Sequence, residues 1–128
     1  EVSKVASGGE LSRLMLAIKY IVTQSSKVNT IVFDEIDSGV SGEIASLMGD
    51  MMLDISKTNQ LVAISHLPQI ASKADIHLKV VKNVTDSNSV SNVLVLNKDE
   101  RIEEIAKLLS GKKLTKAAFD NAAELLNQ

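Results

Sequence analysis

Apolar positions along the chain follow two patterns: short unbroken runs, and longer stretches with helical spacing. The runs within residues 30–35 and 60–65 are apolar at nearly every position, which is typical of strands buried on both faces of a parallel sheet. The stretch between them has helical spacing. A strand, a helix of about 15 residues and a second strand predict a parallel crossover unit. We therefore expect an α/β fold with a mostly parallel sheet and flanking helices.

The first helical stretch covers residues 10–24, directly after a pair of glycines. Its apolar residues at helical spacing are Leu11, Leu14, Met15, Ile18, Ile21 and Val22. They predict one buried face. Gly8 and Gly9 lack side chains, and a helix start offers unpaired N–H groups and the positive end of its dipole. This end of the helix is a candidate grip for a phosphate group.

A second helix follows a loop over residues 36–42, and Ser41 or Gly42 is expected to cap it. Its predicted buried face consists of Ile44, Leu47, Met48, Met51 and Ile55. After the second strand, Pro68 is placed to open a short helix.

The last third of the chain predicts a hairpin and two helices. Residues 76–96 alternate loosely around a turn-rich segment, which favours an antiparallel hairpin. The next helix is expected to end at Gly111, and Thr115 is expected to cap the last one. The residues expected to point inward from these two helices are Ile102, Ile105, Ala106, Leu109, Phe119, Ala122, Ala123 and Leu126.

Polar residues stand where both predicted strands end. Asp34 and Glu35 follow the first strand, and His66 follows the second. Because parallel strands end at a common edge, these side chains are expected to emerge together. Two adjacent acids can divide the work, one holding a divalent metal and the other orienting or deprotonating a water.

Composition adds few constraints. The 128 residues suit one domain, or one lobe of a larger one, and 45% hydrophobic with 23% charged residues is ordinary for a globular protein. A net charge of -2 gives no global sign of nucleic-acid binding. The chain has no cysteine, which fits a reducing interior and excludes disulfides. We expect neither a membrane span nor a signal peptide.

Each candidate feature also has a plain structural explanation. A glycine pair before a helix is often only a flexible entry, an acidic pair often only ends a strand, and His66 alone could be a packed or solvated residue. His77 has no supporting context and is interpreted as structural. On these grounds a non-enzymatic interaction domain stays an alternative. The order and spacing of the three features favour a shared site.

Sequence motifs then indicate a family. Ser7-Gly8-Gly9-Glu10 resembles the signature motif of ABC-type ATPases, residues 31–35 resemble their Walker B strand, and His66 resembles their switch histidine. More narrowly, KVASGGELSRLMLAIK, IVFDEIDSGVSGEIA and ISHLPQIASKAD resemble the RecN family of bacterial DNA repair proteins, which are SMC-like ATPases. The tail ERIEEIAKLLSG resembles the C-terminus of the same family, so the likeness runs almost end to end.

The resemblance implies a fold and a set of roles. Residues 1–128 would be the C-terminal lobe of an ABC/SMC-type head of the P-loop NTPase class, acting on ATP and Mg²⁺. Asp34 would hold Mg²⁺ through water, Glu35 would be the general base, and His66 would contact the γ-phosphate. The motif Ser7, Gly8, Gly9 and Glu10 would grip the ATP of the opposite subunit in a homodimer.

Two departures from the family pattern matter. ABC and SMC proteins usually carry an aspartate where this chain has Ser41, so Asp37 and its neighbours would make the cross-dimer nucleotide contact instead. The chain also lacks a P-loop; residues 110–113 come nearest but follow a helix and lack the required residues. The resemblance implies that the P-loop lies in an N-terminal Walker A lobe beyond a long coiled coil.

The chain is therefore expected to be a fragment that does not hydrolyse ATP alone. The whole protein would act on broken DNA in the bacterial cytoplasm, associated with the nucleoid. The alternatives within this class are the head of another SMC- or Rad50-like ATPase, or the ATPase subunit of an ABC transporter.

Overall fold

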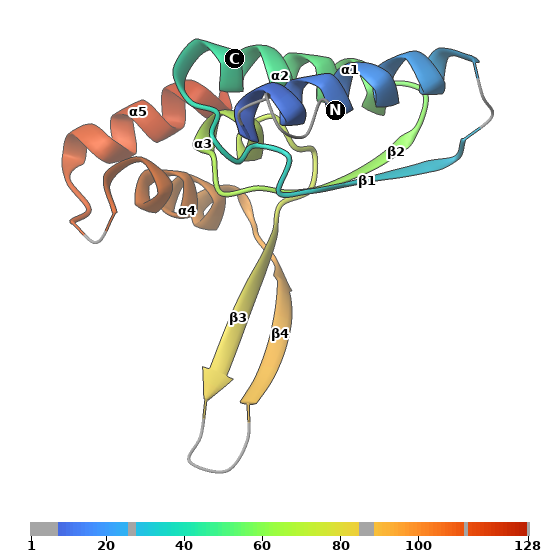
Figure 1. Cartoon of the computed structure of the whole chain (residues 1–128). Helices are drawn as coiled ribbons and strands as arrows, with labels where there is room; N and C mark the ends of the chain where they lie inside the picture. The colour runs from blue at the N-terminus through green and yellow to red at the C-terminus, as the bar shows by residue number, and fades with distance from the viewer. Residues whose placement is uncertain (1–7, 26–27, 85–88, 112, 128) are drawn as a thin grey trace. The chain divides into compact units, whose positions relative to one another are not determined.

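The computed structural model describes residues 8–25, 28–84, 89–111 and 113–127 (Figure 1). The chain divides into two compact units, Glu1–Lys73 and Ala74–Gln128. Each unit has its own sheet and its own helices, and each is described by itself below.

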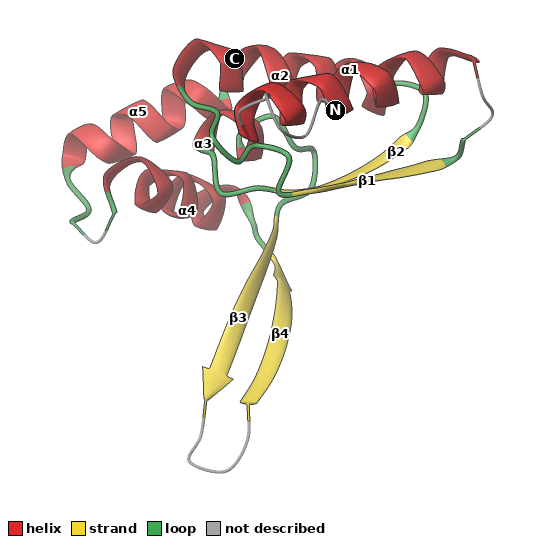
Figure 2. Cartoon of the chain, viewed as in Figure 1, coloured by secondary structure: helices red, strands yellow, loops and turns green. Residues whose placement is uncertain are grey.

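The first unit contains the predicted crossover. Its elements in chain order are α1 (Gly8–Ser25), β1 (Thr30–Asp34), α2 (Gly42–Ser56), β2 (Gln60–Ile64) and the short helix α3 (Pro68–Ala71). Strands β1 and β2 lie side by side (Figure 2). They pair in parallel, in register from Thr30 opposite Gln60 to Asp34 opposite Ile64. The predicted strand-helix-strand unit is confirmed.

The core of the first unit lies on one face of this sheet. Ile31 and Phe33 point into it, while Thr30, Val32 and Asp34 are exposed. The buried residues that complete the core are Leu16, Val40, Ala45, Met48, Met52, Ile55 and Ile70. The expectation that β1 is buried on both faces is therefore wrong for the described chain, because nothing in it covers the other face.

The face of α1 that packs inward differs from the predicted one. Leu16 is buried and Tyr20 is partly buried; the Tyr20 hydroxyl donates to Asp54 Oδ2 on α2 at 2.9 Å. The predicted apolar face is exposed instead, with Ile21 at 65%. Helix α1 is apolar around most of its circumference, so periodicity could not identify which side the rest of this chain covers.

The buried face of α2 agrees with the prediction only in part. Met48 and Ile55 are buried as expected, whereas Ile44 and Leu47 are exposed. Gly49 is also buried, and a Cβ there would stand 3.1 Å from the Gln69 carbonyl oxygen. The missing side chain at this position lets α2 approach the chain around α3 closely.

The second unit is a hairpin followed by two helices. Its elements are β3 (Leu78–Val84), β4 (Ser89–Val95), α4 (Lys98–Ser110) and α5 (Lys116–Leu126), with β3 and β4 antiparallel. The predicted hairpin and the Gly111 and Thr115 helix boundaries are confirmed. Helices α4 and α5 bury Ile105, Ala106, Ala118 and Ala122, whereas Leu109 and Phe119, both expected to point inward, are exposed.

Candidate functional site

The two parallel strands bring the polar residues to one edge. Asp34 is the last residue of β1 and lies opposite Ile64, the last residue of β2. The Glu35 N–H then donates to the Ile64 carbonyl at 3.1 Å, which continues the pairing by one step. Glu35 and the segment Ser65–His66 therefore leave the sheet from the same edge, as the sequence predicted.

Glu35 adopts an unusual backbone conformation. Its φ is 47°, in the left-handed region that side chains rarely occupy. A tight turn holds it there, because both the backbone N–H and the hydroxyl of Ser38 donate to the Glu35 carbonyl, at 3.3 and 3.1 Å. Among the described residues, the exposed carboxylates of Asp34 and Glu35 have no hydrogen-bond or ion-pair partner. Both acids can therefore receive an external ligand.

Asp37 lies on the same turn but points inward and is only 1% exposed. Its Oδ2 accepts from the Ser65 hydroxyl at 2.5 Å and from the His66 N–H at 3.2 Å. Asp37 is predicted to contact a nucleotide, and in this structure its carboxylate is instead buried and bonded within its own unit. From sequence alone, an aspartate in a polar loop is expected to be exposed. Asp37 instead lies on the turn that follows Glu35 and points inward.

The His66 side chain is largely exposed, at 68%, yet one of its ring nitrogens lies close to the buried Asp37 carboxylate. Its Nδ1 lies 3.4 Å from Asp37 Oδ2. Ser65, which sequence reasoning missed, supports the same loop, because its hydroxyl also accepts from the Leu67 N–H at 3.0 Å. The only available signal for Ser65 was its position between a strand end and a histidine.

The start of α1 packs against the turn that follows β1. Gly9 is buried, and a Cβ on it would stand only 2.7 Å from the Gly39 carbonyl oxygen. The absent side chain at Gly9 therefore allows close packing of the helix against this turn, and the predicted phosphate grip at Gly8 and Gly9 stays a prediction. Gly8 is the first residue of α1, Glu10 is exposed on its first turn, and Ser7 lies outside the described residues.

The residues present suit a shared magnesium ion and not a metal centre built by this chain alone. No group of at least three His, Cys, Asp or Glu side chains converges within the part of the chain that the structure describes. Mg²⁺ commonly uses one or two carboxylates, with waters and nucleotide phosphates as its remaining ligands. The exposed acids at the end of β1 fit that arrangement.

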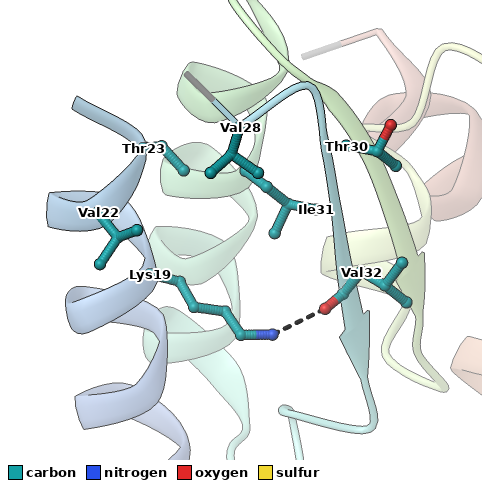
Figure 3. A pocket seen from close by; sticks show the side chains of 7 residues that line it. All are labelled: Lys19, Val22, Thr23, Val28, Thr30, Ile31 and Val32. Carbon is teal, nitrogen blue, oxygen red and sulfur yellow. Dashed lines mark hydrogen bonds between the residues drawn. The ribbon is translucent and has the colours of Figure 1, made fainter. Parts of the chain in front are cut away.

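A hollow in the first unit lies elsewhere. A cavity of about 260 Å³ opens between α1 and β1 (Figure 3). Lys19 crosses it, with Nζ donating to the Val32 carbonyl at 2.7 Å and lying 4.6 Å from the centre of the Phe33 ring. Its lining is mostly apolar and includes none of the candidate site residues. The candidate site lies at the edge of the sheet, outside this cavity.

Curated relatives support the family that the motifs indicate. The chain is 44% identical to DNA repair protein RecN of Rickettsia conorii over 126 residues, and 43% identical to that of Bacillus subtilis over 127 residues. These matches cover 98% and 99% of this chain. This is a RecN-like chain. The RecN-like chain spans less than a quarter of those relatives, 23% and 22% of their lengths, and no protein-family model matches it.

Solved structures support the fold of the RecN-like chain. An SMC head domain with a coiled coil and joint from Pyrococcus yayanosii aligns over 85% of this chain and 20% of its own, at 24% identity and a TM-score of 0.69. A chain from a structural study of ATP-driven dimerization and DNA-stimulated activation of SMC ATPases aligns over 86% of this chain and 66% of its own, at 21% identity and a TM-score of 0.67. The expected α/β head fold is therefore confirmed.

Proposed function

We propose that this chain is the C-terminal half of the ATPase head of a RecN-like DNA repair protein. The observation that carries the proposal is the pairing of β1 with β2, which brings Asp34, Glu35 and His66 to one sheet edge. The complete protein hydrolyses ATP to ADP and phosphate and uses the cycle to act on broken DNA. It works in the bacterial cytoplasm, associated with the nucleoid.

The exposed side chains at this edge have the properties that phosphoryl transfer needs, which are positioning and charge neutralisation. Glu35 orients the attacking water and accepts its proton, since its carboxylate has no other partner among the described residues. His66 contacts the terminal phosphate. Asp34 supplies the protein carboxylate for Mg²⁺, and the ion, when bound, neutralises phosphate charge.

The nucleotide is shared between subunits of a homodimer. The first turn of α1, with Gly8, Gly9 and Glu10, approaches the triphosphate bound to the opposite subunit, together with Ser7 before it. Gly9 contributes through its backbone. It has no side chain, and a Cβ there would meet the Gly39 carbonyl oxygen. The first N–H groups of a helix have no partners within it, so they are available to an anion.

The other half of each site comes from the protein's own N-terminal Walker A lobe. Two features of the first unit support this partner. Exposed apolar residues cover one side of α1, with Leu14 at 45% and Ile18 at 46%, and Val32 is exposed on the open face of the sheet. Parallel sheets are normally covered on both faces, so we expect another part of the protein to pack against the open face of this sheet. Because this chain contains no P-loop, we expect the isolated chain not to hydrolyse ATP.

The test is Glu35→Gln in the full-length protein. The amide keeps the shape of the carboxylate but cannot accept the proton, so turnover is expected to fall by about 10²-fold or more, while ATP still binds and dimers accumulate. Rapid-quench ATPase assays and size-exclusion chromatography with ATP measure the two effects. Unchanged turnover would remove Glu35 from the mechanism.

No helix in the described part of the chain is long and apolar enough to cross a membrane.

Measurable ATP turnover by the purified 128-residue chain would contradict the shared-site proposal. Recovery of turnover on adding the N-terminal lobe is the expected result.

A further inference from the structure

We propose that Asp37 is a positioning residue that fixes the place and the ring orientation of His66. The inference rests on the proposed function, because it assigns a nucleotide contact to His66. It goes beyond that function because Asp37 itself touches neither nucleotide nor metal.

The burial of the two residues is very different. The Asp37 side chain is 1% exposed, whereas that of His66 is 68% exposed. A carboxylate is costly to bury unless hydrogen bonds compensate for the water it loses. Among the described residues, the donors that compensate Oδ2 come from the loop that carries His66. Asp37 is thus a buried anchor for the loop that carries the exposed His66.

One oxygen of Asp37 holds the backbone of that loop. Oδ2 accepts from the Ser65 hydroxyl and from the His66 N–H, and the Ser65 oxygen in turn accepts from the Leu67 N–H. The first residues after β2 are therefore tied to a single carboxylate. Hydrogen bonds to a charged acceptor are about twice as strong as neutral ones, so this anchor is firm.

The same oxygen also sets the orientation of the imidazole. With Nδ1 3.4 Å from Asp37 Oδ2, the Nδ1 edge of the ring is turned inward, which leaves Nε2 to meet a ligand. The Asp37 carboxylate therefore faces the Nδ1 edge of the ring, and the Nε2 edge faces away from it.

Asp37 links this loop to the general base as well. It lies on the turn that begins at Glu35, and its carbonyl accepts from the Val40 N–H at 3.1 Å. The side chain of one residue therefore connects the turn after β1 to the loop after β2. Displacing it is expected to disturb His66 first, because the Glu35 backbone keeps its own bonds to Ile64 and Ser38.

The second oxygen of Asp37 provides a conservative variant. Within the described residues, Oδ1 is buried and has no hydrogen-bond partner. In Asp37→Asn, the amide oxygen can replace Oδ2 and keep its bonds, while the NH₂ group occupies the place of Oδ1. Asp37→Ala removes the anchor entirely. The two variants thus differ in the bonds to Ser65 and His66.

The experiment is a double-mutant cycle in the full-length protein, with kcat and KM for ATP measured for Asp37→Ala, His66→Ala and the double variant. We expect His66→Ala to lower kcat by about 10²-fold and Asp37→Ala by about 10- to 100-fold, with KM nearly unchanged. If Asp37 acts through His66, the double variant loses little more than His66→Ala alone. Asp37→Asn is expected to retain more turnover than Asp37→Ala.

The controls separate positioning from stability. Asp50→Ala removes another carboxylate of the same unit, one that pairs with Lys73 at 2.6 Å and is 55% exposed, and should leave kcat unchanged. Thermal unfolding of every variant shows which ones keep the fold. If Asp37→Ala does not fold, Ser65→Ala replaces it in the cycle, since it removes one arm of the anchor.

The outcomes distinguish the two proposals. Unchanged turnover in His66→Ala would defeat the proposed function itself. A large loss in His66→Ala with losses that multiply in the double variant, or equal losses in Asp37→Asn and Asp37→Ala, would overturn the positioning role while the proposed function stands.

Discussion

Gly9 at the start of α1 packs directly against Gly39 in the turn after β1, so closely that a Cβ on Gly9 would stand 2.7 Å from the Gly39 carbonyl oxygen. Real Cβ atoms essentially never come within 3.0 Å of another heavy atom. The contact locks the helix that carries the candidate phosphate grip to the turn that carries Glu35 and Asp37.

Gly9→Ala is therefore expected to destabilise the protein. Alanine is the better helix former by about 1 kcal/mol, but the added methyl must push a backbone carbonyl aside, so we expect a net loss of about 1–3 kcal/mol. Denaturant unfolding of the chain measures it. Met15→Ala is the control from the same helix, because Met15 is 41% exposed and the change adds no bulk. Equal stability of Gly9→Ala and the parent would contradict the close packing.

The exposed side of α1 predicts an effect that depends on context. Ile18→Gln should leave the stability of the isolated chain within about 0.5 kcal/mol, because Ile18 is 46% exposed there. In the full-length protein the same change should lower stability and ATPase activity, because we propose that the N-terminal lobe covers this side.

Leu16→Ala is the matched control on the opposite side of α1. Leu16 is 1% exposed, so its truncation should cost about 2–5 kcal/mol in either context. Equal effects of Ile18→Gln in the fragment and in the whole protein would show that nothing docks on this side of the helix.

His77 in the second unit should make stability depend on pH. Burial lowers the pKa of His77 below its usual value, with the nearby Arg101 as the second cause, against the opposing influence of Glu104. The unfolded chain, with a pKa of about 6.5, then binds its proton first as the pH falls. Stability due to this group is complete above about pH 7 and is lost towards the lowered folded pKa.

His77→Gln should flatten that part of the stability profile, measured by urea unfolding between about pH 5 and 7.5. His66→Gln, which changes the other histidine, is the control and should keep the slope due to His77. A profile that is unchanged in His77→Gln would assign the pH dependence to other groups.

The order of the elements could be predicted from the sequence because periodicity and turn chemistry are local. Asn97 and Thr115 show this well, since their side chains cap α4 and α5 through bonds to Glu100 and Ala118 only three residues away. The shared edge was also predictable, because the parallel crossover brings the ends of β1 and β2 together without any knowledge of packing.

The faces of the helices and the direction of Asp37 could not be predicted in this way. Which side of α1 is covered depends on what surrounds it, and the relatives are more than four times longer than this chain. The inward direction of Asp37 depends on a positive φ at Glu35, and no glycine there signals such a turn. Both failures arise where tertiary context overrides the local pattern.

The left-handed backbone of Glu35 implies a compromise between folding and chemistry at that position. A glycine would adopt a φ of 47° freely, whereas glutamate is strained there by about 1–3 kcal/mol. Glu35→Gly is therefore expected to raise the melting temperature while abolishing hydrolysis, measured by calorimetry and by ATPase assay. Glu35 would then be a residue that lowers the stability of the fold while enabling catalysis.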